Sequence, residues 1–178
     1  TGAGSVGVTF CTDHDSVWDA YCAISAGDHR ATAACKHRYK QERHTVLLQE
    51  FMEGVEYIIN LVAYKGELKC TAIWRYDKRP YNGSPFVCYS KELMAIDAEP
   101  FLKEMVDYIF GVCKAIHFTN GAMHAECMYI KGRGPVLVEA NCRLHGGGGA
   151  WVAGVERCIG YSQLSIMMDV YLGKGLKF

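Results

Sequence analysis

The chain has 178 residues, in which 19 Lys and Arg residues balance 19 Asp and Glu residues to give a formal net charge of zero. Zero net charge argues against a protein that binds nucleic acids through a broad basic face, and no apolar run approaches the roughly 20 residues that a membrane helix requires. Hydrophobic residues make up 50% and charged residues 21% of the chain, a composition typical of globular and not of disordered proteins.

The first 51 residues contain one helical pattern between two short apolar segments. Asp13 or Asp15 is suited to cap this helix, because a short carboxylate side chain accepts hydrogen bonds from free backbone N–H groups. Gly27 and Asp28 end the pattern. The expected elements are a glycine-rich loop at 1–7, a strand at 8–11, a helix at 16–26, a polar and basic loop at 29–44 and a strand at 45–51.

The rest of the chain predicts strands in hairpin pairs, with helices between the pairs. Lys65-Gly66 is a hairpin signal, and two prolines with Asn82-Gly83 predict a loop at 77–85. The order of elements favours an α+β fold with a mostly antiparallel sheet and a lobe boundary near 52–54. The expected strands are 56–64, 67–76, 85–90, 123–130 and 135–141, the expected helices are 98–118 and 161–172, and a second glycine loop is expected at 146–149.

The glycine-rich loop at the start leaves several functions open. Gly2-x-Gly4-x-x-Gly7 matches the dinucleotide fingerprint, which would indicate an oxidoreductase. That fingerprint requires a helix after the loop, whereas 8–11 is strand-like. A glycine loop between two strands can instead cover nucleotide phosphates with its backbone N–H groups. A plain hairpin turn is the structural alternative.

Two late strands bring carboxylates together. If 131–134 is a four-residue hairpin loop, Ile130 pairs with Pro135 and Glu126 lies opposite Glu139. Two carboxylates in such positions repel each other unless a proton or a cation lies between them. With the oxygen of Asn141 one pleat further on, they form a cluster that suits Mg²⁺; two exposed glutamates on a solvated face are the alternative. On the first strand, one face would carry His124, Glu126 and Met128, and on the second strand, one face would carry Leu137, Glu139 and Asn141.

Two further segments could bind an anion or a nucleotide. Arg143 continues the alternation after Asn141, and its guanidinium could bind a phosphate or an oxyanion through two hydrogen bonds. His145 precedes four glycines, but a lone loop histidine is more often a hydrogen-bonding residue than a base. In the segment 49–57, the backbone could bind an adenine edge and Glu56 could accept hydrogen bonds from ribose hydroxyls.

The nine cysteines indicate a reducing compartment. None of them stands in a Cys-x-x-Cys pair, which argues against a zinc ribbon or a thioredoxin-like site. Most lie within apolar runs, where a cysteine behaves as a small buried hydrophobic residue. We therefore expect reduced cysteines in a cytoplasmic protein.

In this order, four motifs resemble the ATP-grasp superfamily: the glycine loop at 2–7, Gln-Glu-Phe-Met-Glu-Gly-Val-Glu-Tyr at 49–57, Gly-Ala-Met-His-Ala-Glu at 121–126 and Val-Leu-Val-Glu-Ala-Asn-Cys-Arg at 136–143. Within it, the chain is most similar to the carboxylate–amine ligases of the L-amino-acid ligase type. The resemblance implies an ATP-grasp fold, in which nucleotide binds between two lobes of mostly antiparallel sheet. Residues 1–53 would belong to the small lobe and 54–178 to the large lobe.

The resemblance also implies site residues. For the nucleotide, it implies Gly2, Gly4, Ser5 and Gly7 over the phosphates of ATP, Gln49, Glu50 and Met52 at adenine, Glu56 at the ribose and Val138 against the base. For the metal, it implies Glu126, Glu139 and Asn141 as ligands of two Mg²⁺ ions (or Mn²⁺). Arg143 would bind the transferring phosphoryl group or acyl phosphate, and Lys78 would lie in a loop that closes over the phosphates.

The implied activity is an ATP-dependent ligase that joins a carboxylate to an amine through an acyl phosphate, releasing ADP and phosphate. Amino acids are the implied substrates, and a homodimer is one option for assembly. A non-catalytic ATP-binding module is the alternative. Two departures from the family stand out: the chain begins after the strand that carries a family lysine, so we expect a fragment without the N-terminal domain, and 144–149 differs from the Pro-Gly of several relatives.

Overall fold

A computed structural model describes residues 8–26, 46–82 and 84–176. The chain divides into two compact units, Thr1–Met52 and Glu53–Phe178. The first unit contains helix α1 (His14–Ser25), which starts two residues before the predicted range and is capped by Asp13, one of the two predicted candidates. The Asp13 carboxylate accepts from Ser16 N at 2.8 Å, and the Ser16 hydroxyl contacts the Asp13 backbone N–H in return. The strands predicted at 8–11 and 45–51 are wrong where the structure describes them, because 8–11 and 46–51 have no ladder partner there.

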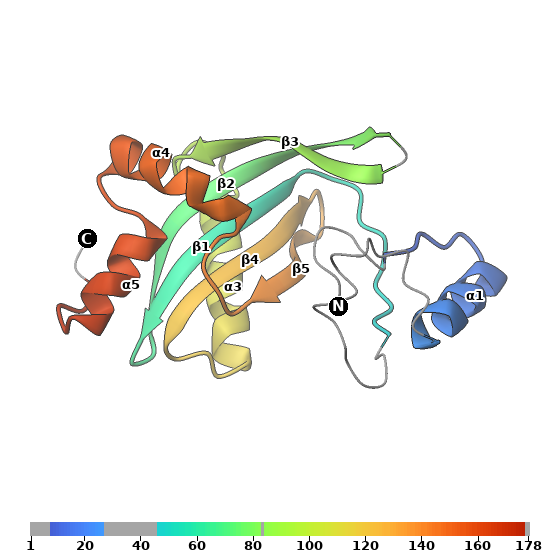
Figure 1. Ribbon diagram of the computed structural model, residues 1–178, viewed down its shortest axis with the longest axis horizontal. Helices are drawn as coiled ribbons and strands as arrows, with labels where there is room; N and C mark the ends of the chain where they lie inside the picture. The colour runs from blue at the N-terminus through green and yellow to red at the C-terminus, as the bar shows by residue number, and fades with distance from the viewer. Residues whose placement is uncertain (1–7, 27–45, 83, 177–178) are drawn as a thin grey trace. The chain divides into compact units, whose positions relative to one another are not determined.

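The second unit contains one five-stranded antiparallel sheet (Figure 1). Its order β3-β2-β1-β4-β5 places β1 at the centre, and every residue of β1 from Glu56 to Ala63 is buried. This arrangement confirms the predicted α+β class with antiparallel pairing. The strands are β1 (Glu56–Tyr64), β2 (Glu67–Tyr81), β3 (Ser84–Met94), β4 (Gly121–Ile130) and β5 (Gly134–Asn141).

The loop predicted at 77–85 is wrong, because β2 and β3 extend through most of it. Tyr81 pairs with Ser84, so only two residues form the turn. Asn82 has a φ of 48°, the left-handed conformation that tight hairpin turns require. Pro80 lies where the register shifts between Arg79 and Tyr81, a position at which its missing N–H costs no ladder bond.

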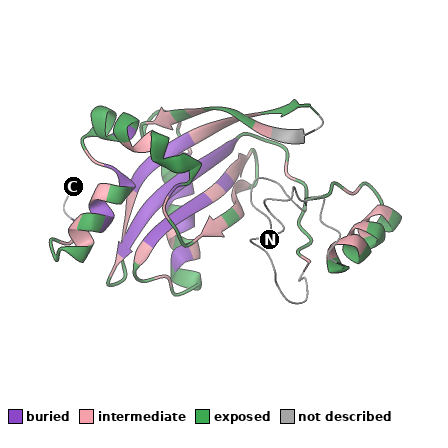
Figure 2. Cartoon of the chain, in the orientation of Figure 1, coloured by how far each residue is buried: buried purple, intermediate pink, exposed green. Residues whose placement is uncertain are grey.

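The two faces of the sheet pack against different helices. Helix α3 (Leu102–Ala115), behind the sheet in Figure 1, buries Met105 and Ile109 in a core with Ile59, Leu61 and Met123. Side chains alternate along a strand, so the residues between these point to the opposite face. Figure 2 shows the buried stripe that runs along β1 and its neighbours.

On the opposite face, α4 (Ala150–Ile159) and α5 (Gln163–Tyr171) cover one end of the sheet. Val155 of α4 packs with Ile58 and Trp74, and Ile166 of α5 packs with Val62. The sequence predicted α5 and α3, although too long at both ends, and did not predict α4. In the described part of the chain, none of the helices combines the length and the apolar character that a membrane crossing requires.

Strand β5 contains an irregularity that changes which side chains share a face. The turn pairs Ile130 with Gly134 and not with Pro135 as predicted, but a bulge at Val138 then restores the pairing of Glu126 with Glu139. Because of the bulge, Leu137 packs on the core that α3 covers and lies on the other face from Glu139. The sequence prediction that Leu137 and Glu139 share a face is therefore wrong.

Candidate active site

Polar side chains gather on the sheet face opposite α3, in two rows across the strands. Asn60 of β1 pairs with His124 of β4, which pairs with Asn141 of β5. One pleat away, Glu126 of β4 pairs with Glu139 of β5. The register therefore brings the three predicted metal ligands, Glu126, Glu139 and Asn141, onto two adjacent strands.

A largely buried carboxylate pair with a lysine lies next to these rows, where Glu56 of β1 stands one pleat beyond Glu126 of β4. Lys78 Nζ, on β2, donates to both oxygens of Glu56 at 2.6 and 2.7 Å, and lies 3.9 Å from Glu126 Oε2. The side chains of Glu56 and Glu126 are only 8% and 15% exposed. One lysine thus joins the predicted ribose residue to a predicted metal ligand.

The two glutamates of this pair share one proton. Burial raises the pKa of Glu56 to about 7; the charge of Glu126 adds to this, and the hydrogen bond from Lys78 opposes it. Burial alone would also raise the pKa of Glu126, but hydrogen bonds with His124 and Glu56 and the charge of Lys78 lower it to about 2. Below about pH 7 the proton of the pair therefore resides on Glu56, and Glu126 stays ionised.

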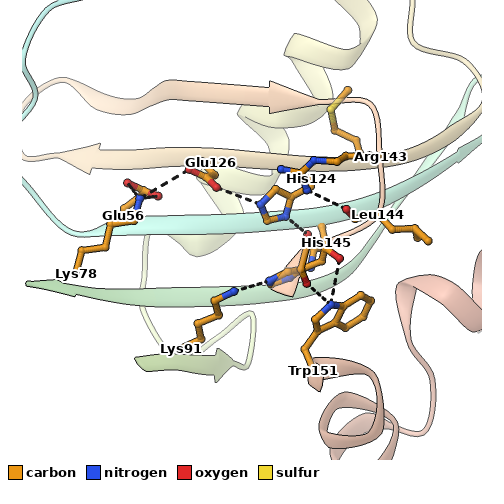
Figure 3. A network of polar contacts seen from close by, with 12 residues as sticks. Glu56, Lys78, Lys91, His124, Glu126, Arg143, Leu144, His145 and Trp151 are labelled. Atoms are coloured by element: carbon orange, nitrogen blue, oxygen red, sulfur yellow. Dashed lines mark hydrogen bonds and ion pairs between the residues drawn. The ribbon is translucent and has the colours of Figure 1, made fainter. Parts of the chain in front are cut away.

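A chain of buried contacts runs from Glu126 across the sheet to β3 (Figure 3). Glu126 Oε1 lies 3.2 Å from His124 Nε2, and His124 Nδ1 lies 2.9 Å from Asn60 Oδ1. The other end of the Asn60 amide lies 2.9 Å from His145 Nδ1, and His145 Nε2 lies 3.1 Å from Lys91 Nζ. Asn60 is fully buried, so these bonds replace the water that its amide loses on folding.

His145 anchors the segment between β5 and α4. Its backbone N–H donates to Gln163 Oε1 at 2.9 Å, and its carbonyl oxygen accepts from Trp151 Nε1 at 3.1 Å. The Trp151 ring stacks on the imidazole with centroids 5.1 Å apart. Burial, then electrostatic interactions with His124, Lys91 and Arg143, lower the pKa of His145 to about 3, so its ring is neutral.

The donors and acceptors along this chain of contacts decide which ring nitrogens carry protons. Asn60 presents Nδ2 to His145 and Oδ1 to His124. In that orientation neutral His145 carries its proton on Nε2, where it faces the ammonium of Lys91, so two donors meet. A half-turn of the Asn60 amide exchanges its oxygen and nitrogen without changing its shape.

After that half-turn, every contact joins one donor to one acceptor. Lys91 donates to Nε2 of His145, and Nδ1–H of His145 donates to the Asn60 oxygen. His124 accepts from the Asn60 amide and donates from Nε2 to Glu126. We therefore assign the proton of His145 to Nδ1 and that of His124 to Nε2.

The donor set around Glu126 and Glu139 fits a hard divalent cation. The two carboxylates face each other across the ladder, and Glu139 is exposed. The Nδ2 atom of Asn141 is buried and has no hydrogen-bond partner among the described residues. A phosphate oxygen would accept from this Nδ2 atom, and the Asn141 oxygen with the two carboxylates is the type of ligand set that a hard cation prefers. In the described part of the chain, His, Cys, Asp and Glu side chains form no cluster of three or more that could hold a metal ion.

The other predicted site residues belong to other segments or fall outside the described residues. Gln49, Glu50 and Met52 lie in a part of the first unit without helix or strand, and Val138 is the bulge residue of β5. Arg143 is exposed and donates from Nη1 to the Leu144 oxygen at 3.0 Å. The four predicted phosphate-loop residues, Gly2, Gly4, Ser5 and Gly7, fall outside the residues that the structure describes.

Sequence reasoning missed four residues that hold the site together. Asn60 had a detectable signal, since it is a lone amide within the apolar run of β1. Lys91 and Gln163 had none, because each is remote in sequence from its partner. Trp151 is only six residues from His145, but it lies in α4, a helix that the sequence did not predict. Gln163 is fully buried and donates to the backbone oxygens of Leu61 and Met123 at 3.0 and 2.9 Å, which ties α5 to the centre of the sheet.

The sequence matches a known protein family and a known ligase. The sequence profile of the ATP-grasp domain matches residues 1–151. Dapdiamide A synthase of Enterobacter agglomerans is 32% identical over 170 residues, which are 96% of this chain and 37% of that protein. The chain thus spans little more than a third of the length of this relative.

Solved structures share the fold at lower identity. The D-alanine–D-alanine ligase of Bacillus anthracis matches with a TM-score of 0.58 and 16% identity, over 97% of this chain and 51% of that one. An L-amino acid ligase from Bacillus licheniformis matches with a TM-score of 0.55 and 22% identity, over 66% of this chain and 29% of that one.

Proposed function

The chain belongs to the ATP-grasp domain family, and on that premise we propose that it carries the nucleotide and metal site of an ATP-dependent carboxylate–amine ligase. The observation that carries the proposal is the pairing of Glu126 with Glu139 across β4 and β5, with Asn141 and then Arg143 following on the same segment. Similarity to a dapdiamide synthase over 96% of the chain supports this class of chemistry.

Glu126, Glu139 and Asn141 would hold two Mg²⁺ ions, or Mn²⁺, between the sheet and the phosphates of ATP. Bound there, the ions would neutralise charge on the transferring phosphoryl group. The ionised state of Glu126 suits this role, and hydrogen bonds with His124 and Glu56 together with the charge of Lys78 keep it charged. Glu56 would bind the ribose, as an acceptor and, when protonated, also as a donor.

In the proposed reaction, an oxygen of the substrate carboxylate attacks the γ-phosphorus of ATP, and ADP leaves. The amine of the second substrate then attacks the acyl carbon of the acyl phosphate, the C–N bond forms, and phosphate leaves with the electron pair of the broken C–O bond. The exposed guanidinium of Arg143 would bind the oxyanion in both steps, a contribution of about 3–4 kcal/mol for one well-placed donor. Lys78 would add a second positive charge near the phosphates.

The rest of the proposed nucleotide site comes from segments outside the sheet. Gly2, Gly4, Ser5 and Gly7 would cover the phosphates with backbone N–H groups, and backbone at Gln49, Glu50 and Met52 would bind adenine. Val138, at the β5 bulge, would pack against the base. Amino acids are the proposed acid and amine substrates.

Measurement of ADP and phosphate release tests the proposal. The full-length protein that carries this chain is incubated with Mg-ATP and all pairs of the 20 proteinogenic amino acids. We expect release that depends on a particular acid and amine. Mg-dependent ATP binding without release by any pair would favour a non-catalytic ATP-binding module, and absence of ATP binding would contradict both functions.

A further inference from the structure

Asn60 is a buried amide at the centre of an aliphatic stretch of β1. Its neighbours along the strand, Ile58, Ile59, Leu61 and Val62, are fully buried, and so is Asn60 itself. An aliphatic side chain at this position would need no hydrogen-bond partner, whereas a buried amide destabilises the fold unless both of its ends are paired. The amide therefore indicates a polar task at this point of the sheet.

The pairing of β1 with β2 is irregular at the same residue. Asn60 pairs with Ala72, whereas Leu61 pairs with Cys70, so Thr71 is an extra residue on β2. The buried hydroxyl of Thr71 donates to the Asn60 backbone oxygen at 3.2 Å. A bulge of this kind changes the direction of neighbouring side chains and is common beside functional sites.

The buried contacts on both sides of Asn60 run in one direction. The ammonium of Lys91 only donates hydrogen bonds, and the ionised carboxylate of Glu126 only accepts them. The groups between these ends, His145, Asn60 and His124, each offer one donor and one acceptor to their two neighbours. The Asn60 amide therefore accepts from His145 and donates to His124, which leaves Nε2–H of His124 to donate to Glu126.

His124 contacts Glu126 through a ring that is held at both nitrogens. Its Nδ1 atom lies 2.9 Å from the nearer amide atom of Asn60, and its Nε2 atom lies 3.2 Å from Glu126 Oε1 (Figure 3). The His124 side chain is only 2% exposed, so water does not replace either contact. A second contact on the far nitrogen fixes both the tautomer and the orientation of an imidazole ring.

We propose that Asn60 is a positioning residue of the metal site, which acts through His124 to hold the Glu126 carboxylate in place for the cation. The inference rests on the proposed function and extends it to a residue two contacts away from a metal ligand. Replacement of residues that orient the ligands of a metal typically lowers metal affinity by about 10–100-fold. Loss of the Asn60 amide should therefore weaken the contribution of the metal and spare the contacts of the nucleotide itself.

Two affinities of the non-hydrolysable analogue AMPPNP separate these effects. Calorimetry with the full-length protein that carries this chain gives one affinity in Mg²⁺ and another in EDTA, and their ratio reports the contribution of the metal. We expect Asn60→Leu to lower the ratio about tenfold or more, and to leave the affinity in EDTA within about twofold of the parent protein.

Matched variants show whether the effect passes through His124. His124→Phe should lower the ratio as much as Asn60→Leu does, and His124→Gln should restore most of it, because a glutamine amide can still donate to Glu126. Ile59→Ala removes a fully buried side chain from the other face of the same strand, so it destabilises the protein without removing a polar contact of the site. Its ratio should match that of the parent. If Asn60→Leu does not fold, Asn60→Ser is measured in its place, since a serine hydroxyl is too short to hold the His124 ring.

A ratio in Asn60→Leu equal to that of the parent would overturn the proposal. An equal fall in Ile59→Ala would also overturn it, because the effect would then follow from lost stability, and so would a ratio in His124→Gln as low as in His124→Phe. An equal loss of affinity in Mg²⁺ and in EDTA would assign Asn60 to nucleotide binding instead. A parent protein that binds AMPPNP equally well in Mg²⁺ and EDTA, or does not bind it, would contradict the proposed function, and this inference with it.

Discussion

Glu126 and Glu139 are direct partners across the β4–β5 ladder, although the turn that joins these strands is one residue out of its predicted register. The bulge at Val138 restores the pairing. Two carboxylates in this position disfavour the sheet unless a cation lies between them, so the chain accepts a local cost in stability where the proposed metal site lies.

Glu139→Gln should remove the response of the protein to Mg²⁺ without unfolding it. The substitution relieves the repulsion with Glu126, and we expect an unchanged free energy of unfolding or a gain of up to about 1 kcal/mol in metal-free buffer. Mg-ATP should raise the melting temperature of the parent protein but not of the variant. Glu67→Gln, at an exposed position at the start of β2, is the matched control and should respond like the parent. Normal ADP release by Glu139→Gln would remove the metal assignment.

Stability should fall as pH rises from about 4.5 to 7, because of Glu56. Its pKa is raised from the ordinary value of 4.5 to about 7, so the folded state binds more protons than the unfolded state in this window. The shift of the Glu56 pKa corresponds to a contribution of at most roughly 3 kcal/mol to the free energy of unfolding, and this contribution is lost by the time the pH exceeds 7. Urea denaturation at pH 5 and pH 8 measures it. Glu56→Gln cannot ionise and should lose less stability between these two values; an equal loss in both proteins would argue against the shared proton.

Glu126 should act in the opposite direction at lower pH. Its pKa is lowered to about 2, so the unfolded state binds more protons between about pH 2 and 4.5, and stability falls as the pH drops through that range. Glu126→Gln should reduce this acid dependence. A parent protein whose free energy of unfolding stays constant between pH 4.5 and 2.5 would contradict the ionised state of Glu126.

Asn60→Leu should destabilise the protein by about 2–6 kcal/mol. Leucine has a similar volume, but it leaves a ring nitrogen of His124 and one of His145 buried without a partner, at about 1–3 kcal/mol each. Urea denaturation measures the loss. Asn120→Ala removes a hydrogen bond to Lys65 N at an exposed position and should cost less than about 1 kcal/mol. A cost for Asn60→Leu no larger than that of the control would show that the amide does not hold the two rings.

His145 should remain neutral from pH 5 to 8, with its proton on Nδ1. Burial and nearby cations lower its pKa to about 3, and donation from Lys91 to Nε2 leaves only Nδ1 for the proton. Two-dimensional NMR of protein with ¹⁵N-labelled histidine distinguishes the two tautomers. A proton on Nε2, or titration of the ring near pH 6, would contradict the assigned orientation of the Asn60 amide.

The sequence predicted the hairpins because the strands β1, β4 and β5 alternate or are continuously apolar, and because their turns carry glycine. It failed at α4, whose N-cap residue is Gly149 in a left-handed conformation without a side-chain cap, so the usual signal for a helix start is missing. It also failed at Pro80, taken as the sign of a loop, since a proline at a register shift does not end a strand.

The sequence likewise predicted some contacts of the candidate site and not others. The facing glutamates follow from the two-residue period of strands, whereas the contact between Lys91 and His145 joins residues 54 positions apart. Contacts of this kind depend on the packing of β3 against the segment after β5, and local sequence patterns carry no information about them. The lone amide of Asn60 was the only sign of the buried polar contacts that a pattern could have given.

Transfer of oxygen from the acid to phosphate tests the proposed ligase most directly. The full-length protein is incubated with Mg-ATP and a mixture of amino acids whose carboxylates carry ¹⁸O, so that the acid substrate need not be known. An acyl phosphate leaves one carboxylate oxygen on the released phosphate, and ³¹P NMR should show phosphate with a single ¹⁸O atom. Release of unlabelled phosphate alone, or no release of phosphate, would contradict the account.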